Sequence, residues 1–402
     1  MENYKAIVVG AGPVGVALAL ALSRVDENQP ILLLDAAAAL PKYSPEKPDA
    51  RIFALNEGAR SLLDQLGVWS DIQSQRCLPY SRMQVWDAQG TGSIEFDCVD
   101  SGADFDTRSL GHIVEANLIQ EMLTKAIDNQ PNIRLVHPEK VSDLDLTDNQ
   151  AILGLESGQR VQAELVCAAD GANSSLRQMA GIQVNEEHTG QEAIVANVWH
   201  ELPNECCAWQ IFMPTGPLAF LPMADFEGRH LSSIVWSLDQ EDAERLKQSS
   251  DQEFEFALTR AIEERFGQVS LMSKRFSFSL VQRHAQTYVQ PSFALVGDAA
   301  HSIHPLAGLG ANIGFQDVAA LTEELARATS RSIPWGNLQI LKRYQRARQF
   351  DNELVLKSMK GFKDLFGQTN PAIAAIRNLG LQGANVTPAI KRRFIQQATM
   401  SR

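Results

Sequence analysis

The chain opens with two short apolar runs that are separated by a helical pattern. Residues 6–9 (Ala-Ile-Val-Val) and 31–34 (Ile-Leu-Leu-Leu) are continuous aliphatic runs, and residues 16–24 are mostly apolar helix formers. Continuous apolar strands joined through a helix are typical of a parallel sheet with both faces covered. The pattern therefore predicts a strand, a helix and a second, parallel strand, with a further helix at about residues 56–66.

Strand patterns dominate the middle of the chain, at about residues 75–110 and 190–290, and after Gly314 the pattern is helical almost to the end. Two more buried runs, 165–169 and 293–296, are followed by Asp-Gly and Gly-Asp. We expect a helix over 251–266 and antiparallel strands over 194–199, 208–212, 218–221, 232–238 and 273–280.

Together these patterns predict an α/β fold in which a Rossmann-like domain is interleaved with an antiparallel-sheet domain and followed by a C-terminal helical segment. The expected boundaries are 1–75, 105–185 and 285–330 for the discontinuous Rossmann-like domain, 76–104 and 186–284 for the second domain, and 331–402 for the helical region.

Charge and hydropathy narrow the class of protein. The 402 residues carry a net charge of −12, which argues against nucleic-acid binding. No apolar run reaches the roughly 18 residues that span a membrane, and the first run lacks the features of a signal peptide, so we expect a cytoplasmic protein without a transmembrane segment. Residues 335–402 hold twelve Lys and Arg against three Asp and Glu, and an anionic partner or membrane surface would bind there.

The five cysteines are scattered along the chain without the spacing of metal ligands. Reduced thiols of a cytosolic protein are the expected state, and a redox-active pair formed by Cys206 and Cys207 is the less favoured alternative.

The first motif is Gly10-x-Gly12-x-x-Gly15, between the first strand and the first helix. Gly10 permits a tight turn, Gly12 leaves room for a pyrophosphate, and Gly15 lets the helix pack closely on the strand. The helix N-terminus attracts the phosphates. Asp35, 20 residues after Gly15, would bind a ribose and repel a 2′-phosphate. The motif predicts FAD or NAD rather than NADP, with a purely structural glycine turn as the alternative.

A second glycine-dense stretch, residues 297–314, follows a buried strand and leads into a helix. Such glycines bring the backbone close to a planar or anionic ligand. Asp298 is suited to accept hydrogen bonds from a ribityl chain, and a helix that begins near Asn312 would favour a reduced, anionic flavin. A metal site formed by Asp298, His301 and His304 is a weaker alternative, because no further ligand cluster lies nearby. We therefore predict no metal.

A third bend, residues 167–177, has Asp170-Gly171 after a buried strand and Ser174 as a helix N-cap. By itself this stretch is only a strand–turn–helix junction.

The three motifs, in this order and spacing, resemble those of the flavoprotein aromatic hydroxylases typified by p-hydroxybenzoate hydroxylase. Segments 49–55, 83–87, 110–115, 214–222 and 297–314 are most similar to the ubiquinone-biosynthesis hydroxylases, which oxidise polyprenylated phenols and benzoquinols. The resemblance implies an FAD domain, a substrate domain, and hydroxylation of a prenylated aromatic ring by O₂ through a flavin C4a-hydroperoxide. It also implies NAD(P)H as external reductant, partners in a ubiquinone-biosynthesis complex, and a peripheral location at the inner membrane.

The resemblance further implies roles for matching residues, and two positions depart from the family pattern. Leu309 stands where family members usually have Gln, and Glu115 stands where they often place an Arg or Gln that contacts FAD. Pro305 would face the substrate. The implied FAD-binding residues are Gly10, Gly12, Pro13, Val14, Gly15, Asp35, Arg51, Asp170, Gly171, Asp298, Gly310, Ala311 and Asn312.

No catalytic side chain is assigned, because the cofactor carries the difficult chemistry in this reaction class. His304 and Pro305 are the nearest candidates, and a structural role in a turn is favoured for His304. Phe220, Pro222 and Trp236 lie in apolar strands that would wall a hydrophobic substrate pocket, although the same residues would serve equally well as sheet core.

Two other functions fit parts of the sequence. One is a flavin dehydrogenase or reductase that acts on an isoprenoid without oxygen chemistry. The other is a flavin-binding scaffold that assembles a biosynthetic complex through the basic C-terminal helices.

Overall fold

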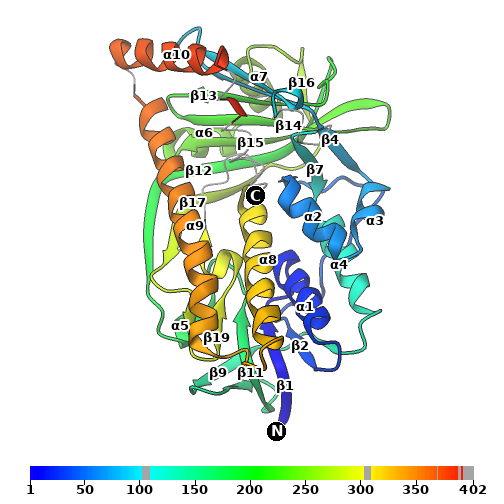
Figure 1. Ribbon diagram of the computed structural model, residues 1–402. Coiled ribbons are helices and arrows are strands. Elements are labelled where there is room, and N and C mark those ends of the chain that lie inside the picture. The colour runs from blue at the N-terminus through cyan, green and yellow to red at the C-terminus, as the bar shows by residue number, and fades with distance from the viewer. Residues whose placement is uncertain (102–108, 303–308, 369, 388–390, 393–402) are drawn as a thin grey trace.

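The computed structural model describes residues 1–101, 109–302, 309–368, 370–387 and 391–392. Its secondary structure is mixed, and the predicted α/β class is confirmed. The residue boundaries of the two predicted domains stay a prediction, although the two large sheets are each assembled from segments that alternate along the chain (Figure 1).

The first large sheet, here called the parallel sheet, positions all three glycine motifs. Its order is β18-β19-β11-β1-β2-β8, and β11 also carries β10 and β9. Strands β1, β2, β8, β11 and β19 run parallel. The bounds are β1 Glu2–Val9, β2 Ile31–Leu34, β8 Ile133–Val136, β9 Val141–Leu146, β10 Ala151–Leu155, β11 Arg160–Ala168, β18 Val289–Gln290 and β19 Phe293–Leu295.

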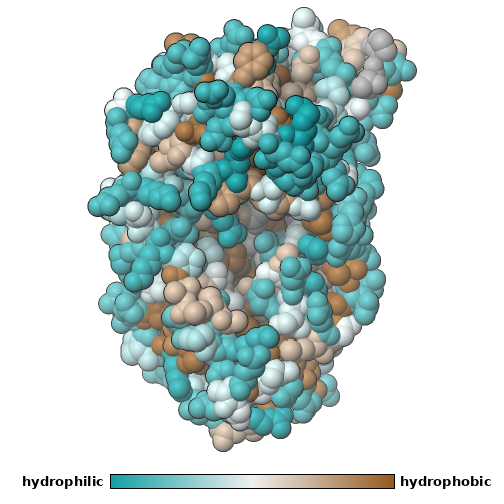
Figure 2. All heavy atoms as spheres, turned by 180° about the vertical axis from the view of Figure 1, so that it is seen from behind, coloured by the Kyte–Doolittle hydropathy of each residue, from teal (hydrophilic) through white to brown (hydrophobic). Residues whose placement is uncertain are grey.

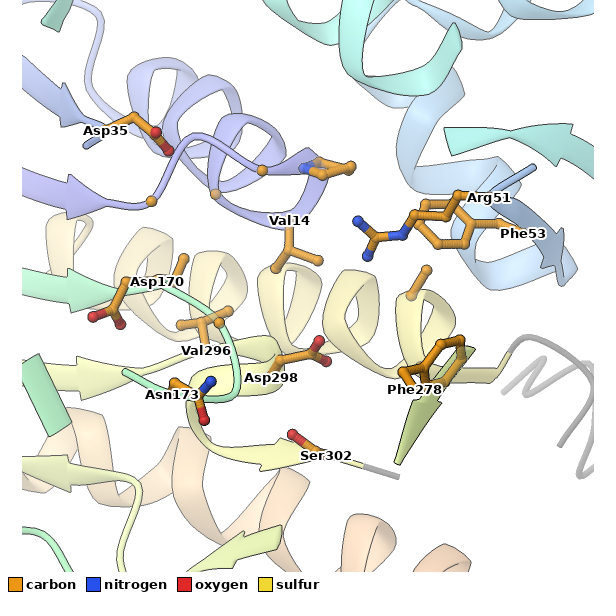
Figure 3. A pocket seen from close by; sticks show the side chains of 18 of the residues that line it. Val14, Asp35, Arg51, Phe53, Asp170, Asn173, Phe278, Val296, Asp298 and Ser302 are labelled. Carbon is orange, nitrogen blue, oxygen red and sulfur yellow. The ribbon is translucent and has the colours of Figure 1, made fainter. Parts of the chain in front are cut away.

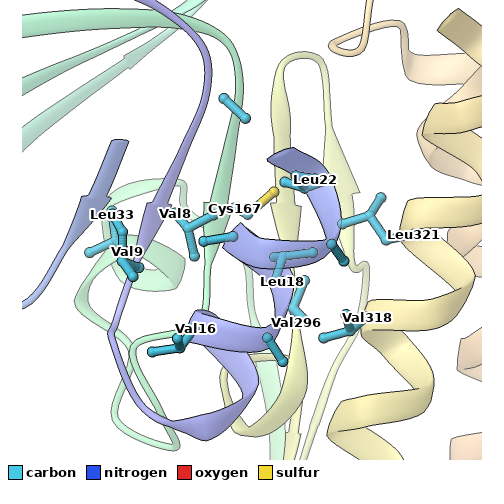
Figure 4. Close-up of a cluster of buried hydrophobic side chains, with 14 of the residues drawn as sticks. Val8, Val9, Val16, Leu18, Leu22, Leu33, Cys167, Val296, Val318 and Leu321 are labelled. Carbon is cyan, nitrogen blue, oxygen red and sulfur yellow. The ribbon is translucent and has the colours of Figure 1, made fainter. Parts of the chain in front are cut away.

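Because β19, β11 and β1 are neighbours, the bends that follow them meet at one edge of the sheet. Helix α1 (Pro13–Val25) packs against α8 (Leu309–Thr329) on one face (Figure 1). Figure 4 shows the core between them, where Leu18 and Leu321 meet Val8 and Val296 with almost no exposed surface. Packing of this kind fixes the helix N-termini relative to the bends.

Smaller elements complete this half of the molecule. The three-stranded sheet β3-β7-β4 lies beside helices that precede or follow its strands. The bounds are β3 Ile52–Leu55, α2 Glu57–Gln65, α3 Trp69–Gln73, β4 Cys77–Tyr80, β7 Gly111–Glu115, α4 Ala116–Ile127 and α5 Ser175–Met179, with a short 3₁₀ turn at Gly297–Ala299.

The second large sheet, here called the antiparallel sheet, has the order β20-β17-β12-β15-β14-β13-β5-β6, with β16 beside β12. Helices α6 (Gln240–Gln248) and α7 (Asp251–Ala261) cover one face. Helix α7 ends five residues before the predicted end, where Glu263 and Glu264 adopt positive φ of 58° and 56°. The strand bounds are β5 Arg82–Asp87, β6 Ser93–Asp97, β12 Val184–His200, β13 Cys207–Met213, β14 Gly216–Phe226, β15 Arg229–Asp239, β16 Val269–Leu271, β17 Phe276–Ala285 and β20 His301–Ser302.

Two C-terminal helices, α9 (Leu338–Phe366) and α10 (Pro371–Asn385), are tied by buried ion pairs to α8 and to β5 of the antiparallel sheet. Arg348 on α9 binds Asp317 on α8 with an Nε–Oδ1 distance of 2.8 Å. Arg377 on α10 binds Asp87 on β5 at 2.6 Å, and both side chains are almost fully buried. Across the described ranges, no helix combines the length and apolar character needed to cross a membrane.

Candidate active site

An elongated cavity of about 960 Å³ lies between the parallel and antiparallel sheets. It is lined by the bends after β1, β2, β11 and β19, by the loop before β3, by the start of α8, and by strands β12, β14, β15 and β17. Figure 3 shows Asp35 at one end and Arg51, Phe53 and Phe278 at the other. Seen from behind, the mostly hydrophilic surface is hollowed near mid-height, with apolar side chains inside the hollow (Figure 2).

The three glycine bends converge at this cavity. The Ala169 N–H donates to Val9 O at 2.8 Å, which joins the bends after β11 and β1. A Cβ on Gly10, which has a φ of 104°, would lie 2.3 Å from the carbonyl oxygen of Ala169. Only glycine tolerates that approach.

Gly12 and Gly15 serve different physical purposes. A Cβ on Gly15 would lie 1.8 Å from the Gly10 carbonyl oxygen, so this glycine allows α1 to pack on β1. A Cβ on Gly12 would meet no atom of the described chain within 4 Å, because it would project into open space. Gly12 is the N-cap of α1 and supplies no side chain to cap it, so the first-turn N–H groups are available to an anion.

Asp35 follows β2 and faces the end of the cavity that is remote from Arg51 (Figure 3). Its Oδ2 accepts a hydrogen bond from Ala11 N at 2.6 Å, and its Oδ1 accepts one from Ala37 N at 2.7 Å. Each carboxylate oxygen can accept a second hydrogen bond. Asp35 therefore orders the glycine turn and retains capacity for a ribose hydroxyl.

Arg51 enters the cavity from a loop that buried polar groups hold in place. Its guanidinium lies 5.3 Å from the centre of the Phe53 ring. The buried Glu115 accepts a hydrogen bond from Asp49 N at 2.7 Å and pairs with Arg76 at 2.5 Å. Glu115 does not line the cavity and instead anchors the loop that carries Arg51, which accounts for the departure from the family pattern at this position.

Asp298 lies in the turn after β19 and points into the cavity (Figure 3). Its side chain is exposed to that space, but the surrounding protein removes much of the bulk water. This desolvation raises the pKa of Asp298, while the nearby His301 and Arg51 act in the opposite direction. A partially desolvated carboxylate is suited to accept hydrogen bonds from ligand hydroxyls.

A buried ion-pair network fixes the turn that carries Asp298. Asp317 on α8 accepts a hydrogen bond from Gly297 N at 3.0 Å and lies 2.5 Å from Nε2 of His301. Burial would raise the pKa of Asp317, but His301 and Arg348 outweigh burial and lower it. His301 thus pairs with Asp317, and the described residues contain no cluster of three or more potential metal ligands.

The third bend is locked to the second by Arg177. This buried side chain donates to Ala172 O at 3.0 Å and to Ala299 O at 2.8 Å. Ser174 is the N-cap of α5, as predicted. Asp170 lines the cavity, its Oδ2 accepts from Leu176 N at 3.2 Å, and its buried Oδ1 has no partner among the described residues. The sequence pattern assigned no role to Arg177, although its position three residues after the predicted N-cap Ser174 was apparent.

The start of α8 brings Gly310 and Ala311 to the cavity but not the side chain of Asn312. Asn312 is buried, where it donates to Ala54 O at 2.7 Å and accepts from Asn56 N at 2.9 Å. The side chain of Asn312 therefore ties α8 to β3. The predicted contact of Asn312 with FAD stays a prediction, and its backbone would have to make that contact. His304 and Pro305 lie outside the described residues.

Three of the four predicted substrate-pocket residues, Phe220, Pro222 and Trp236, do not line the cavity. The alternative role for them, in the core of the sheet, fits their positions. Phe220 stacks on Phe266, and Trp236 packs near Phe254, in the core beneath α6 and α7. Pro222 is buried in β14 and does not line the cavity. Because side chains alternate across a strand, the cavity wall is formed by residues of the other face, namely Val195, Leu221, Ser233, Val235, Phe276 and Phe278.

Burial makes Cys207 a poor nucleophile, which disfavours the alternative of a redox-active pair with Cys206. Both thiols are free, and burial raises the pKa of Cys207 to about 12, so its thiolate is scarce at neutral pH.

The donor set fits an extended dinucleotide. It comprises an open helix N-terminus, the carboxylates of Asp35 and Asp298 facing the cavity, and a buried Asp170 oxygen that has no partner among the described residues. The fold and cavity therefore define a protein that binds a dinucleotide at the carboxyl edge of a parallel sheet. A family model described as an FAD binding domain matches residues 3–357, and the chain belongs to this family.

Relatives of known activity match almost the full chain. The 3-demethoxyubiquinol 3-hydroxylase of Escherichia coli (strain K12) is 36% identical over 391 residues, which cover 97% of each chain. The ubiquinone biosynthesis monooxygenase COQ6 of Danio rerio is 32% identical over 453 aligned residues, covering 99% of this chain and 90% of the relative.

Solved structures share the fold. The p-nitrophenol 4-monooxygenase PnpA of Pseudomonas putida DLL-E4 superposes with a TM-score of 0.79 at 20% identity and 99% coverage of both chains. The flavin-dependent monooxygenase PieE, solved in complex with FAD and substrate, gives a TM-score of 0.69 at 18% identity, covering 99% of this chain and 71% of PieE. Together the comparisons confirm the predicted family, FAD as cofactor, and the enzyme class, an FAD-dependent aromatic hydroxylase.

Proposed function

We propose that the protein hydroxylates the ring of a polyprenylated phenol or benzoquinol in ubiquinone biosynthesis, with O₂ as the oxygen source and NAD(P)H as external reductant. The observation that carries the proposal is the cavity, which is polar along the three glycine bends and apolar along the antiparallel sheet. The full-length similarity to two ubiquinone-biosynthesis hydroxylases supports the choice of substrate class.

Different residues along the cavity would contact different parts of FAD. Gly12, with Pro13 and Val14 in the first turn of α1, would hold the pyrophosphate, and Asp35 and Asp298 would bind ribose and ribityl hydroxyls. Further contacts with FAD would come from the bends at Gly10, Gly15 and Gly171, from Asp170, and from Gly310 and Ala311. When bound, FAD supplies the activation of O₂.

The protein's own contribution at the substrate end is orientation and exclusion of water. The six residues of the antiparallel sheet that wall this end include no group that titrates near neutral pH. The positive charge of Arg51 at its edge favours the ionised form of a phenol or a reduced flavin. Among the described residues of this wall no base is available, so the substrate's own ring oxygen would activate the ring. The apolar wall would keep water from the reacting centre.

Isotopically labelled O₂ tests the proposal. Purified protein is incubated with NAD(P)H, labelled O₂ and a short-tailed benzoquinol, and the product is analysed by mass spectrometry. We expect the product to carry one labelled oxygen atom, as a new hydroxyl group on a ring carbon. Oxidised substrate without the label would indicate a dehydrogenase, and a yellow protein without any turnover would indicate a scaffold.

We further propose that the C-terminal helices bring the enzyme to the membrane that dissolves such a substrate. Ile376, Leu379 and Val386 project from the α10 region with 70%, 68% and 78% of their surface exposed. The basic charge of these helices would contribute less to membrane binding than the sequence suggests, because basic residues such as Lys360 and Lys391 are paired with acidic residues. Membership of a biosynthetic complex stays a prediction.

Liposome flotation tests this contact. The double variant I376S/L379S is expected to float less than the wild-type protein, because less apolar surface enters the interface. F256S, which removes an equally exposed ring from α7, serves as the matched control. Equal flotation of the wild type and the double variant would contradict the proposed membrane contact.

A further inference from the structure

The cavity wall, which is apolar except for Ser233, continues outward across four neighbouring strands. Leu221 on β14 lies opposite Ser233 on β15, Val235 on β15 lies opposite Val195 on β12, and Val195 lies opposite Phe276 on β17. The strands are adjacent in the order β14-β15-β12-β17. Three inter-strand spacings of about 4.8 Å give this stripe a length of about 14 Å.

The exposure of the stripe rises toward its outer end. Leu221 is 3% exposed, whereas Phe276 and Phe278 are 54% and 45% exposed although both line the cavity. In the Phe276-Ser-Phe278-Ser alternation of β17, both rings project from the same face. Figure 3 shows Phe278 facing the same space as Arg51 and Phe53, at the end remote from Asp35.

We infer that Phe276 and Phe278 form the exit for the apolar tail of the substrate, so that the ring lies deep at Leu221 and Val235 while the tail leaves across β17. A long polyprenyl chain has to leave the cavity on an apolar path. Single exposed apolar residues are ordinary, but this pair continues a buried apolar stripe and stands at its solvent end, where a hydrocarbon chain would cover both rings.

The tail exit rests on the proposed function, and it makes a separate prediction about affinity. Both Phe side chains act on the tail and not on the substrate's aromatic ring, so removing them weakens binding only of long-tailed compounds. Covering half of two Phe rings corresponds to about tenfold in affinity. Phe256 is 69% exposed on α7 and does not line the cavity, which makes it a matched control.

The experiment compares the holoenzyme with F276S/F278S and with F256S, using benzoquinones with one isoprene unit or with a chain of several units, in one detergent. The Kd of each compound is obtained by titration, and FAD content and melting temperature are recorded. We expect the Kd of the long-tailed compound to rise about tenfold in F276S/F278S, with no change for the short compound, for FAD content or for F256S.

Three results would overturn the inference. If F276S/F278S bound the short and the long compound equally less tightly, the two Phe rings would contact the head group. If the variant lost FAD, the Phe rings would contact the cofactor. If the affinities for both compounds were unchanged, the tail would lie elsewhere. The Kd ratio does not depend on turnover. A wild-type enzyme that binds the long-tailed benzoquinone more tightly than the short one, but leaves the corresponding long-tailed benzoquinol unhydroxylated in the presence of NAD(P)H and O₂, would contradict the proposed reaction and uphold the tail exit.

Discussion

Replacing Gly12 by Ala should separate cofactor binding from folding. The Cβ that Gly12→Ala introduces meets no described atom within 4 Å, and Gly12 has a φ of −70° and a ψ of 174°, which any residue adopts. The apoprotein should therefore be as stable as the wild type, or more stable by about 0.4–1 kcal/mol through reduced entropy of the unfolded chain.

The cost of Gly12→Ala should appear in the affinity for FAD. The new methyl group occupies the space at the N-terminus of α1 and keeps a phosphate from its N–H donors. Losing one or more hydrogen bonds to a charged group costs about 1.5–3 kcal/mol, which corresponds to about 10- to 150-fold in Kd. Deflavinated protein is titrated with FAD by fluorescence, and melting of the apoprotein is followed in parallel.

Gly15→Ala is the matched comparison, because its Cβ would lie 1.8 Å from the Gly10 carbonyl oxygen. This variant should lose stability outright, with or without FAD. Wild-type FAD affinity in a folded Gly12→Ala protein would refute the assignment of the pyrophosphate to this turn, and destabilised Gly12→Ala apoprotein would refute the geometry from which the prediction is drawn.

Three further predictions concern buried groups. Arg348→Met should lower the free energy of unfolding by about 3–5 kcal/mol, because it leaves Asp317 buried and without this partner. Arg343→Met, at a more exposed ion pair, should lower it by at most about 1 kcal/mol. Equal losses of unfolding free energy in urea denaturation would contradict this prediction. Burial lowers the pKa of His112 to about 4, so the folded protein binds this proton at a lower pH than the unfolded chain and loses stability as the pH falls from about 6.5 to about 4. His112→Gln should show a shallower decline, and identical pH profiles would argue against it. Burial raises the pKa of Cys207 to about 12, so iodoacetamide should label it only after denaturation, as peptide mass analysis would reveal.

Much of the nucleotide-binding half could be predicted because its signals are local. The roles of Gly10, Gly12 and Gly15 follow from their spacing between one strand and one helix, and the structure places them at a single turn. The helix N-cap at Ser174 is likewise set by residues three positions apart.

The substrate end could not be predicted because its strands are buried on both faces. In β14 and β15 apolar residues occupy both sides of the sheet, so periodicity alone does not distinguish Phe220, which packs in the core beneath α7, from Leu221, which lines the cavity. The contacts of Asn312 and Glu115 join segments more than 60 residues apart, and such pairings follow from the tertiary fold alone.

Electron density for FAD in a crystal of the holoenzyme would show whether the three glycine bends bind a single cofactor against the apolar wall. We expect one extended FAD whose pyrophosphate lies at Gly12. Its ring system should lie between Arg51 and the Gly310–Ala311 start of α8 and should face Leu221 and Val235. A cofactor bound away from the three bends, or a ring system turned from that apolar wall, would contradict this expectation.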